Sequence, residues 1–367
     1  MFAIPRQASR NQGGFSLVEL MVAMVIGMLG VIVIMQVFSL SESRKRTTTG
    51  GNDAMTEGVM SLYAMQRDIR MAGHGIGDTK VLGCNTLLRA GVTLNAMAPV
   101  TINHASITGQ DVNTDTLLIV YGNSNGSPQG DAVSVTAPVV NVVATPSAFA
   151  ANDWVVDAPD RVNSCSLTLD NVASVDLATG ALTLNSGRTL TAGNTVYNLG
   201  RTFKVVVYAI RSGNLTICDY TTNDCGSAAN NSSTAVWVPI ANNVVSLRAQ
   251  YGRDTTAVMD GVVDIYDQTT PTPTSATTGC NWARASAIRM ALVSRSAEFE
   301  KTTVTGAAPV WEGSTAGNPT GSAAAAINLT KNPDGTANPN WQNYRYKTFQ
   351  TVIPVRNLTW MGAVSGC

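Results

Sequence analysis

The stretch GFSLVE at residues 14–19 leads into the apolar run LMVAMVIGMLGVIVIMQVFSLS at residues 20–41, and these two segments decide the fold. The 22 residues of the run carry no charge. As a helix they span about 33 Å at roughly 1.5 Å per residue, which matches a hydrocarbon core about 30 Å thick. Basic residues follow at 44–46. We therefore predict a membrane-spanning helix.

A generic membrane anchor does not explain two features of this segment. Glu19 places an acid near the start of the helix, and a charge at the bilayer centre costs about 2.5–3.5 kcal/mol and is usually functional. Gly13 and Gly14 stand directly before the run. A cleaved secretory signal fits no better, because its apolar core is shorter and ends at a small-x-small site that this run lacks.

The sequence around Gly14 resembles the class III signal of type IV pilins and type II secretion pseudopilins. The resemblance implies that a prepilin peptidase removes residues 1–14 as a leader peptide by cutting after Gly14, and methylates the new amino terminus at Phe15. It also implies that Glu19 is the assembly acid of the family. A neighbouring subunit's liberated amine would pair with Glu19, because two charges that are costly alone are tolerable together.

Later parts of the sequence resemble the PilW group of minor pilins. The residues that carry this resemblance are RDIRMAGH at 67–74, VVSLRAQYG at 244–252, DGVVD at 260–264, IRMALV at 288–293, YRYK at 344–347 and TVIPVRN at 351–357. Residues 81–199 show little of it.

The order of patterns predicts an α+β, pilin-like lollipop. A hydrophobic transmembrane and assembly helix occupies residues 15–46, and the run TTTGG at residues 47–51 is expected to weaken or interrupt it. A second, amphipathic helix reads from about residue 52 to 71, within a segment at 47–78 that packs on the head. A large, mainly antiparallel β-rich periplasmic head fills residues 79–367.

Strand patterns dominate the predicted head, with turn signals between them. Residues 268–278 and 306–340 look like loops, and the second is expected to be exposed. The clearest strand runs are residues 116–121, 204–210, 215–218, 244–251, 288–294 and 346–353.

All cysteines lie after the apolar run, and their even number suits disulfides in an oxidising compartment. Cys218 and Cys225 close a short loop and are the most plausible pair, while the other four allow three connectivities. Free buried thiols are the alternative. The six are Cys84, Cys165, Cys218, Cys225, Cys280 and Cys367.

Several classes of function are disfavoured. Lys+Arg and Asp+Glu number 24 each, so no basic excess indicates a nucleic-acid partner. The two histidines, His74 and His104, occur in no H-E-x-x-H motif, and there is no G-x-S-x-G or P-loop. We therefore predict no enzyme, no catalytic residue and no cofactor.

Four aspartates cluster near Gly261 and raise the question of calcium, which takes six to eight oxygen ligands. Their spacing does not match an EF-hand, and a solvated hairpin with Asp-Gly at its turn is the more common structure. We predict no metal site. The four are Asp254, Asp260, Asp264 and Asp267.

The resemblance implies a minor pilin that primes or caps a type IV pilus. The alternatives are a minor pseudopilin of type II secretion and a pilus-tip adhesin. The expected partners are prepilin peptidase, other minor pilins, the major pilin and the inner membrane, with a tip adhesin as a further candidate. The expected location is a single pass through the inner membrane with a periplasmic head, and later the pilus, at its tip.

Replacing Gly14 is expected to leave an uncut precursor, because the resemblance makes this glycine the residue that precedes the cut. Intact-mass spectrometry of the membrane form measures the outcome directly. A chain that still begins at Phe15 after the replacement contradicts the processing prediction.

Overall fold

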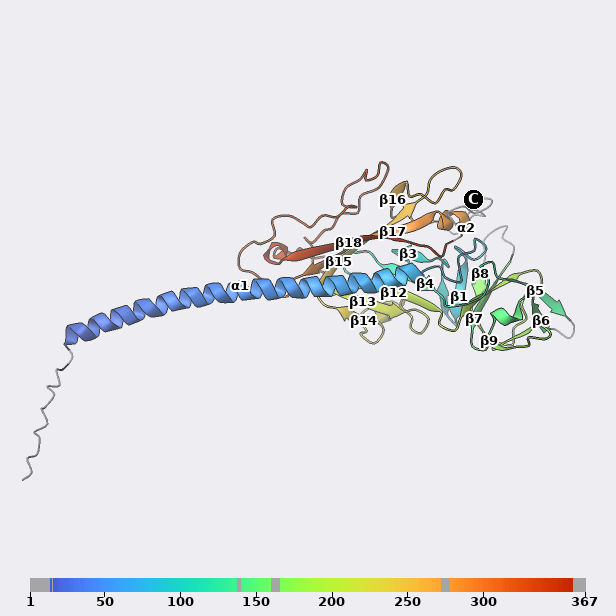
Figure 1. Ribbon diagram of the computed structural model, residues 1–367, viewed down its shortest axis with the longest axis horizontal. Coiled ribbons are helices and arrows are strands. Elements are labelled where there is room, and N and C mark those ends of the chain that lie inside the picture. The colour runs from blue at the N-terminus through green and yellow to red at the C-terminus, as the bar shows by residue number, and fades with distance from the viewer. Residues whose placement is uncertain (1–13, 15, 137–139, 160–165, 272–277, 359–367) are drawn as a thin grey trace, which may run out of the picture. The chain divides into compact units, whose positions relative to one another are not determined.

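The computed structural model describes residues 14, 16–136, 140–159, 166–271 and 278–358 (Figure 1). The chain divides into two compact units, residues 1–50 and 51–367. The first contains the apolar half of a long helix, and the second contains the other half of that helix and every described strand.

Helix α1 (Leu17–Met71) is continuous over 55 residues. The expected interruption at residues 47–51 is therefore wrong. Threonine and glycine each cost at most about 1 kcal/mol in a helix interior, and propagation between two formed segments adds a hydrogen bond for each residue fixed. The Thr48 hydroxyl also stays inside the helix, because its Oγ1 donates to the carbonyl oxygen of Arg44 at 3.0 Å.

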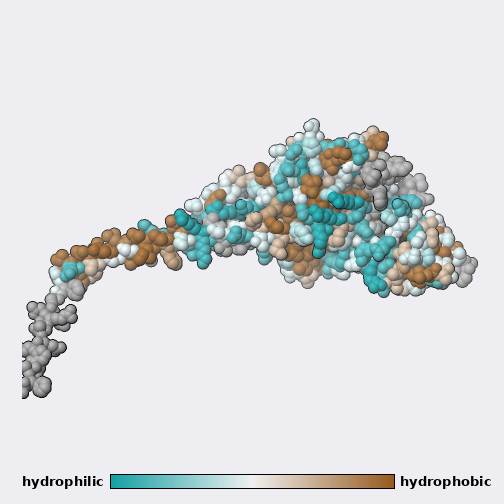
Figure 2. All heavy atoms as spheres, viewed as in Figure 1, coloured by the Kyte–Doolittle hydropathy of each residue, from teal (hydrophilic) through white to brown (hydrophobic). Residues whose placement is uncertain are grey.

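The apolar part of α1 is a candidate membrane span. It covers Leu17–Glu42, a length of 26 residues, and none of its most apolar window is buried. Figure 2 shows apolar side chains along this part of the helix. Length and composition alone support the span, and both agree with the sequence-based prediction.

Strands make up most of the second unit, with short helices between some of them. The short helices are α2 (Thr278–Ala283), η1 (Pro146–Ala148), η2 (Ala228–Asn230) and η3 (Trp341–Asn343). The strands are β1 (Asn85–Arg89), β2 (Val92–Leu94), β3 (Val100–Ile102), β4 (Leu117–Tyr121), β5 (Asp131–Thr136), β6 (Val140–Val143), β7 (Trp154–Ala158), β8 (Ser166–Thr168), β9 (Asp170–Val175), β10 (Ala181–Leu184), β11 (Thr195–Gly200), β12 (Lys204–Arg211), β13 (Asn214–Asp219), β14 (Val238–Ala241), β15 (Val244–Arg253), β16 (Ile265–Asp267), β17 (Ala285–Arg295) and β18 (Tyr346–Pro354).

These strands form three open sheets and one closed barrel. The open sheets have the orders β2-β1-β8, β14-β13-β12-β4-β3 and β16-β15-β17-β18, and the barrel has the order β10-β6-β5-β11-β7-β9. Among the described pairs, β1 with β8 is parallel and the others are antiparallel. A long apolar helix followed by a mostly antiparallel β domain confirms the predicted α+β, pilin-like fold.

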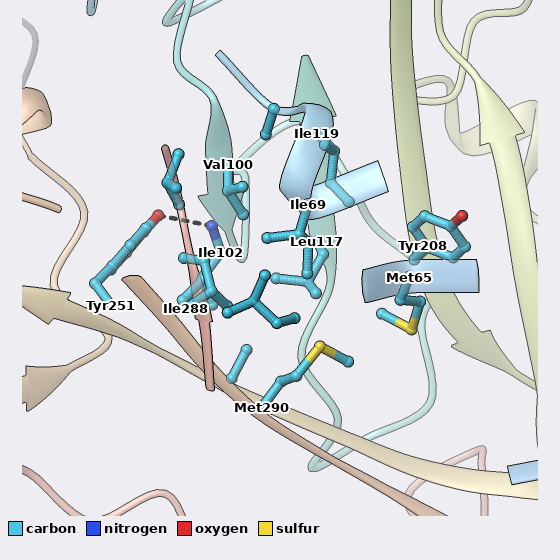
Figure 3. Close-up of a cluster of buried hydrophobic side chains, with 14 of the residues drawn as sticks. Met65, Ile69, Val100, Ile102, Leu117, Ile119, Tyr208, Tyr251, Ile288 and Met290 are labelled. Carbon is cyan, nitrogen blue, oxygen red and sulfur yellow. Dashed lines mark hydrogen bonds between the residues drawn. The ribbon is translucent and has the colours of Figure 1, made fainter. Parts of the chain in front are cut away.

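The second half of α1 packs into the main core of this unit (Figure 3). Met65 and Ile69 lie four residues apart on one face of the helix, and both are fully buried. They share an apolar cluster with Ile119 of β4, Tyr208 of β12 and Met290 of β17. Since burying one large apolar side chain contributes about 1.5–3 kcal/mol, this face of α1 is held by strands from two sheets.

Polar contacts also join these two sheets. The backbone N–H of Ile102 in β3 donates to the Tyr251 hydroxyl of β15 at 2.6 Å (Figure 3). Buried Asp115, just before β4, accepts from the backbone N–H of Ala249 and from the Arg248 guanidinium, both at 2.9 Å. Because Ile102 lies opposite Leu117 and Asp115 is two residues before Leu117, these bonds fix the two sheets relative to each other at one end of the β3–β4 pair.

The barrel is inserted between two neighbouring strands of the five-stranded sheet. Strands β4 and β12 pair directly, with Tyr121 opposite Lys204, so residues 122–203 leave and return at the same place. The barrel has its own core, whose buried members, such as Phe149, Val155 and Leu182, all lie between Val133 and Val196. Most of this region lies within residues 81–199, where the sequence showed little of the family resemblance.

The loop at 306–340 is only partly exposed, so its prediction needs a correction. Trp311 is buried, and its indole N–H donates to the carbonyl oxygen of Ala325 at 2.7 Å. Ile327 and Leu329 are buried in the same cluster, against Val293 of β17. Trp311 stands alone in sequence, while Ala325, Ile327 and Leu329 are buried at alternate positions. This alternation is short and begins in a run of alanines, so it did not stand out as a strand pattern. In the other predicted loop, residues 272–277 lie outside the described residues.

Gly58 is expected to tolerate no side chain. A Cβ atom there would overlap the Phe349 ring and the Ser294 hydroxyl, whereas a Cβ at Gly51 meets nothing within 4 Å. Gly58→Ala should therefore lower the free energy of unfolding by about 1–3 kcal/mol through overpacking. The matched variant Gly51→Ala should raise it by up to about 1 kcal/mol through helix propensity.

Denaturant unfolding of the full chain in detergent, followed by the fluorescence of the head tryptophans, measures both variants. Equal stability of the two would contradict the close contact between α1 and β18.

Candidate functional site

The processing motif lies at the start of α1. Gly14 is exposed and non-helical, and Phe15 and residues 1–13 lie outside the described residues. The first helical hydrogen bond runs from the Leu20 N–H to the Ser16 carbonyl oxygen at 3.1 Å. A peptide bond that precedes the helix can be presented to a peptidase in an extended form without unwinding helical turns.

Glu19 lies in the first turn of α1, and its side chain is exposed. A carboxylate at this end of a helix is favoured by the helix dipole, typically by about 0.3–1 kcal/mol. The apolar side chains that follow it are exposed in every direction around the helix, including Leu20, Val25, Ile32 and Phe38. An apolar surface this extensive needs lipid or another apolar helix as its environment.

A buried carboxylate fixes the docked half of α1. Asp68 is only 3% exposed, and its Oδ2 accepts a hydrogen bond from the Tyr208 hydroxyl at 2.7 Å. Its Oδ1 lies 3.5 Å from Nε of Arg67, whose side chain is mostly exposed. Helix α1 thereby presents a charged group to β12 beside the buried apolar side chains of Met65 and Ile69.

The two tyrosines near Asp68 remain hydrogen-bond donors at neutral pH. Burial raises the pKa of Tyr121 to about 12, and the charge of Asp68 contributes to the shift. Burial also raises the pKa of Tyr208 far above its usual value, as does its hydrogen bond to Asp68. Because the phenols keep their protons, the contact between α1 and β12 does not weaken as the pH rises through neutrality.

The carboxyl end of α1 is capped from the far end of the chain. The Asn357 side-chain amide donates to the carbonyl oxygens of Arg70, Met71 and Ala72, each at 3.1 Å. These carbonyls belong to the last turn, where the helix itself supplies no partner. Gly73 then turns the chain in the left-handed conformation, with φ of +85°, as expected of a helix C-cap.

The predicted disulfide between Cys218 and Cys225 is present, with their Cα atoms 6.1 Å apart. Cys84 and Cys280 are disulfide-bonded as well, so the alternative of free thiols is wrong for these four cysteines. Cys165 and Cys367 lie outside the described residues. The short disulfide loop is braced by Arg89, which donates to its backbone at Tyr220 and Thr221.

The aspartates near Gly261 do not converge on one point. The Asp254 carboxylate accepts from the backbone N–H groups of Thr256, Asp260 and Gly261 at 2.7–3.0 Å, while Asp267 pairs with Arg253. Burial would raise the pKa of Asp254, but a hydrogen bond from the Thr256 hydroxyl, together with these backbone bonds, holds it below its usual value. Asp254, the best candidate for a calcium ligand among the four, therefore already accepts hydrogen bonds from backbone N–H groups.

The turn that these aspartates support joins two antiparallel strands, β15 and β16, as the hairpin prediction required. The expectation that the hairpin is solvated is wrong for Asp254, which is only 2% exposed. Gly261 takes the left-handed conformation in it, with φ of +75°. Within the described ranges, no group of three or more His, Cys, Asp or Glu side chains is placed to hold a metal ion.

Two family matches cover separate parts of the chain. Residues 9–35 match the Prokaryotic N-terminal methylation motif, which includes Gly14 and Glu19. Residues 207–357 match the family described as Type IV Pilus-assembly protein W, from β12 through β18 to the capping Asn357. No curated protein and no solved structure matches the chain.

The apolar helix, the antiparallel head and the methylation motif define a type IV pilin-like protein. Within that class, the second half of the head is similar to the PilW type over residues 207–357. The barrel lies outside both matched segments.

Asp68→Ala is expected to lower the free energy of unfolding by about 1–3 kcal/mol, because it leaves the buried Tyr208 hydroxyl without its acceptor. Arg67→Ala is the matched control on the exposed side and should change stability by less than about 0.5 kcal/mol. Thermal and urea unfolding of the full chain in detergent measure both.

The double variant Asp68→Ala/Tyr208→Phe should be more stable than Asp68→Ala alone, since it removes the orphaned hydroxyl as well as its partner. If the second substitution brings no recovery, the hydrogen bond is not what Asp68 contributes.

Proposed function

We propose that this protein is a minor pilin that primes or caps the assembly of a type IV pilus. The observation that carries the proposal is the pairing, in one chain, of the methylation motif at residues 9–35 with the pilus-assembly family match at residues 207–357. The first implies entry into a helical fibre by way of the membrane, and the second implies a head of the minor-pilin kind.

Processing is the first step of the proposed mechanism. A prepilin peptidase cuts after Gly14 and methylates the amine of Phe15, so residues 1–14 act as a leader. The apolar helix at residues 15–46 then holds the subunit in the inner membrane, with the head at residues 79–367 in the periplasm. The exposed apolar surface of Leu17–Glu42 supports this step, because that surface needs a lipid environment before assembly.

Registration is the second step. Glu19 sits four positions after Phe15, one helical turn into the mature chain. Inside a bundle of apolar helices, its carboxylate is costly unless a neighbour's terminal amine neutralises it. A subunit at the wrong height leaves both charges without a partner, so the pair selects one axial position for the incoming helix.

Initiation or capping is assigned to the head. Other minor pilins and the major pilin are the proposed partners, and the pilus tip is the proposed location. The family described as Type IV Pilus-assembly protein W favours pilus assembly over the piston of type II secretion. The methylation motif alone does not separate the two systems, because pseudopilins share it.

Glu19→Ala should leave cleavage intact but reduce the amount of this subunit in sheared fibres by about tenfold or more, the loss that corresponds to about 1.4 kcal/mol. Quantitative immunoblotting of fibre and membrane fractions measures the ratio. Glu19→Asp keeps the charge and should retain part of the incorporation. Unchanged incorporation of Glu19→Ala would remove the registration mechanism.

Deletion of the whole gene tests the function itself. Loss of surface fibres and twitching with normal enzyme secretion supports pilus priming. Lost secretion with normal fibres indicates a pseudopilin instead, and normal fibres with lost attachment indicates an adhesin.

A further inference from the structure

The edge strand β18 differs from every other sheet edge in the described part of the chain. It is nine residues long and pairs with β17 in one unbroken register. The other edges, β2, β3, β8, β14 and β16, have four residues or fewer. The longest of them, β14, also contains Pro239 and an irregular register. Short edges, prolines and bulges prevent unwanted strand pairing, and β18 uses none of these over its length until Pro354.

The outward-facing backbone groups of β18 can be identified from its ladder. The Val355 N–H donates to Ser286 O and the Ser296 N–H donates to Arg345 O, each at 2.8 Å. Hydrogen-bonded pairs recur at every second residue of an antiparallel ladder, so the odd-numbered residues of β18 bond to β17. The N–H and C=O groups of Thr348, Gln350 and Val352 therefore point away from the sheet.

These outward groups have no hydrogen-bond partner within the described residues. The side chains of Gln350 and Val352 are exposed, and residues 348–353 carry no charge. Lys347 and Pro354 bound this uncharged stretch. Unpaired, regularly spaced backbone donors and acceptors on an uncharged strand match one kind of ligand, which is another extended strand.

The direction of β18 limits which subunit can supply the strand that pairs with it. Gly58 lies against the Phe349 ring, Gln66 bonds Thr351 at 2.7 Å, and Asn357 caps the end of α1. Strand β18 thus runs alongside α1 in the same direction. A second copy paired antiparallel through a twofold axis would reverse its own α1, and the two helices could not enter one membrane in the same orientation.

The outward face of α1 beside this strand is apolar and exposed, at Met55, Val59 and Tyr63. A neighbouring subunit whose helix covers that face has its head next to the edge of β18. We propose that the outer edge of β18 pairs with a β-strand from the head of a neighbouring, different pilin-like subunit. This inference rests on the proposed function, because it names the partner and the contact through which the head acts in assembly.

Hydrogen exchange of single amides tests the contact with an internal control. The full chain is compared in detergent and in isolated fibres. The amides of Thr348, Gln350 and Val352 should exchange rapidly in detergent and slowly in the fibre, while those of Phe349 and Thr351 are slow in both. Equal exchange of the first three in the two states overturns the proposal.

Gln350→Pro removes one outward N–H without removing a bond to β17, because proline is tolerated where the N–H of an edge strand faces outward. Like Gln350→Thr, it loses the bond that the Glu312 N–H donates to Gln350 Oε1 at 2.9 Å, so its thermal midpoint should match that of Gln350→Thr. It should lose about tenfold in fibre assembly when it replaces the natural chain. Gln350→Thr keeps the N–H and should assemble normally. Val352→Lys, which adds a charge to the edge, is the second blocked variant and covers the case in which proline disturbs folding.

A photo-cross-linking phenylalanine analogue at position 350 identifies the occupant. A cross-link to a head strand of another pilin-like subunit supports the proposal. A cross-link to a second copy of this chain, to an unrelated protein, or to nothing overturns it.

If deletion abolishes fibres while both blocked variants restore them fully, the edge inference fails and the proposed function stands. If deletion leaves fibres and twitching intact, the proposed function itself fails.

Discussion

The fold depends on an apolar helical surface that cannot remain in water. From Leu17 to Leu40, the large apolar side chains of α1 are exposed on all sides. No amphipathic arrangement would let this segment settle on a soluble domain, because it has no polar face to leave outside. The same continuous helix becomes one-sided after Gly51, where Met65 and Ile69 are buried and Tyr63 is not. One element thus meets two environments, and the change in its pattern marks the boundary between them.

The head contacts the second part of that helix from several sides. Apolar contacts come from strands of two sheets, and Asp68 adds one directional bond inside them. Phe349 and Asn357, from the other end of the chain, close over the helix and its last turn. Because these contacts come from segments far apart in sequence, the helix can hold its position only when the head is fully folded.

Sequence patterns were sufficient where the structure is regular and local. The apolar run, the strand runs at 204–210 and 346–353, and the Cys218–Cys225 pair are all present, since each depends on nearby residues. The helix through residues 47–51 was missed because local propensity was weighed without the helical segments on both sides. The amphipathic pattern of this helix does not show that Asp68 is buried with Met65 and Ile69, because an acid is ordinarily expected on the polar face. The hydrogen-bond partner of Asp68, the Tyr208 hydroxyl, is 140 residues away in sequence. A local sequence pattern cannot reveal a contact between residues so far apart.

The meeting of β4 and β12 has a consequence for the order in which the head can form. Tyr121 and Lys204 are neighbours in space but are separated by the whole barrel in sequence. Closing so long a loop costs conformational entropy before any contact compensates for it, and nonlocal pairing of this kind slows folding. A barrel that collapses first on its own core brings both ends together and turns the long closure into a short one. The inserted module would then hold the two strands together during folding while the five-stranded sheet is completed.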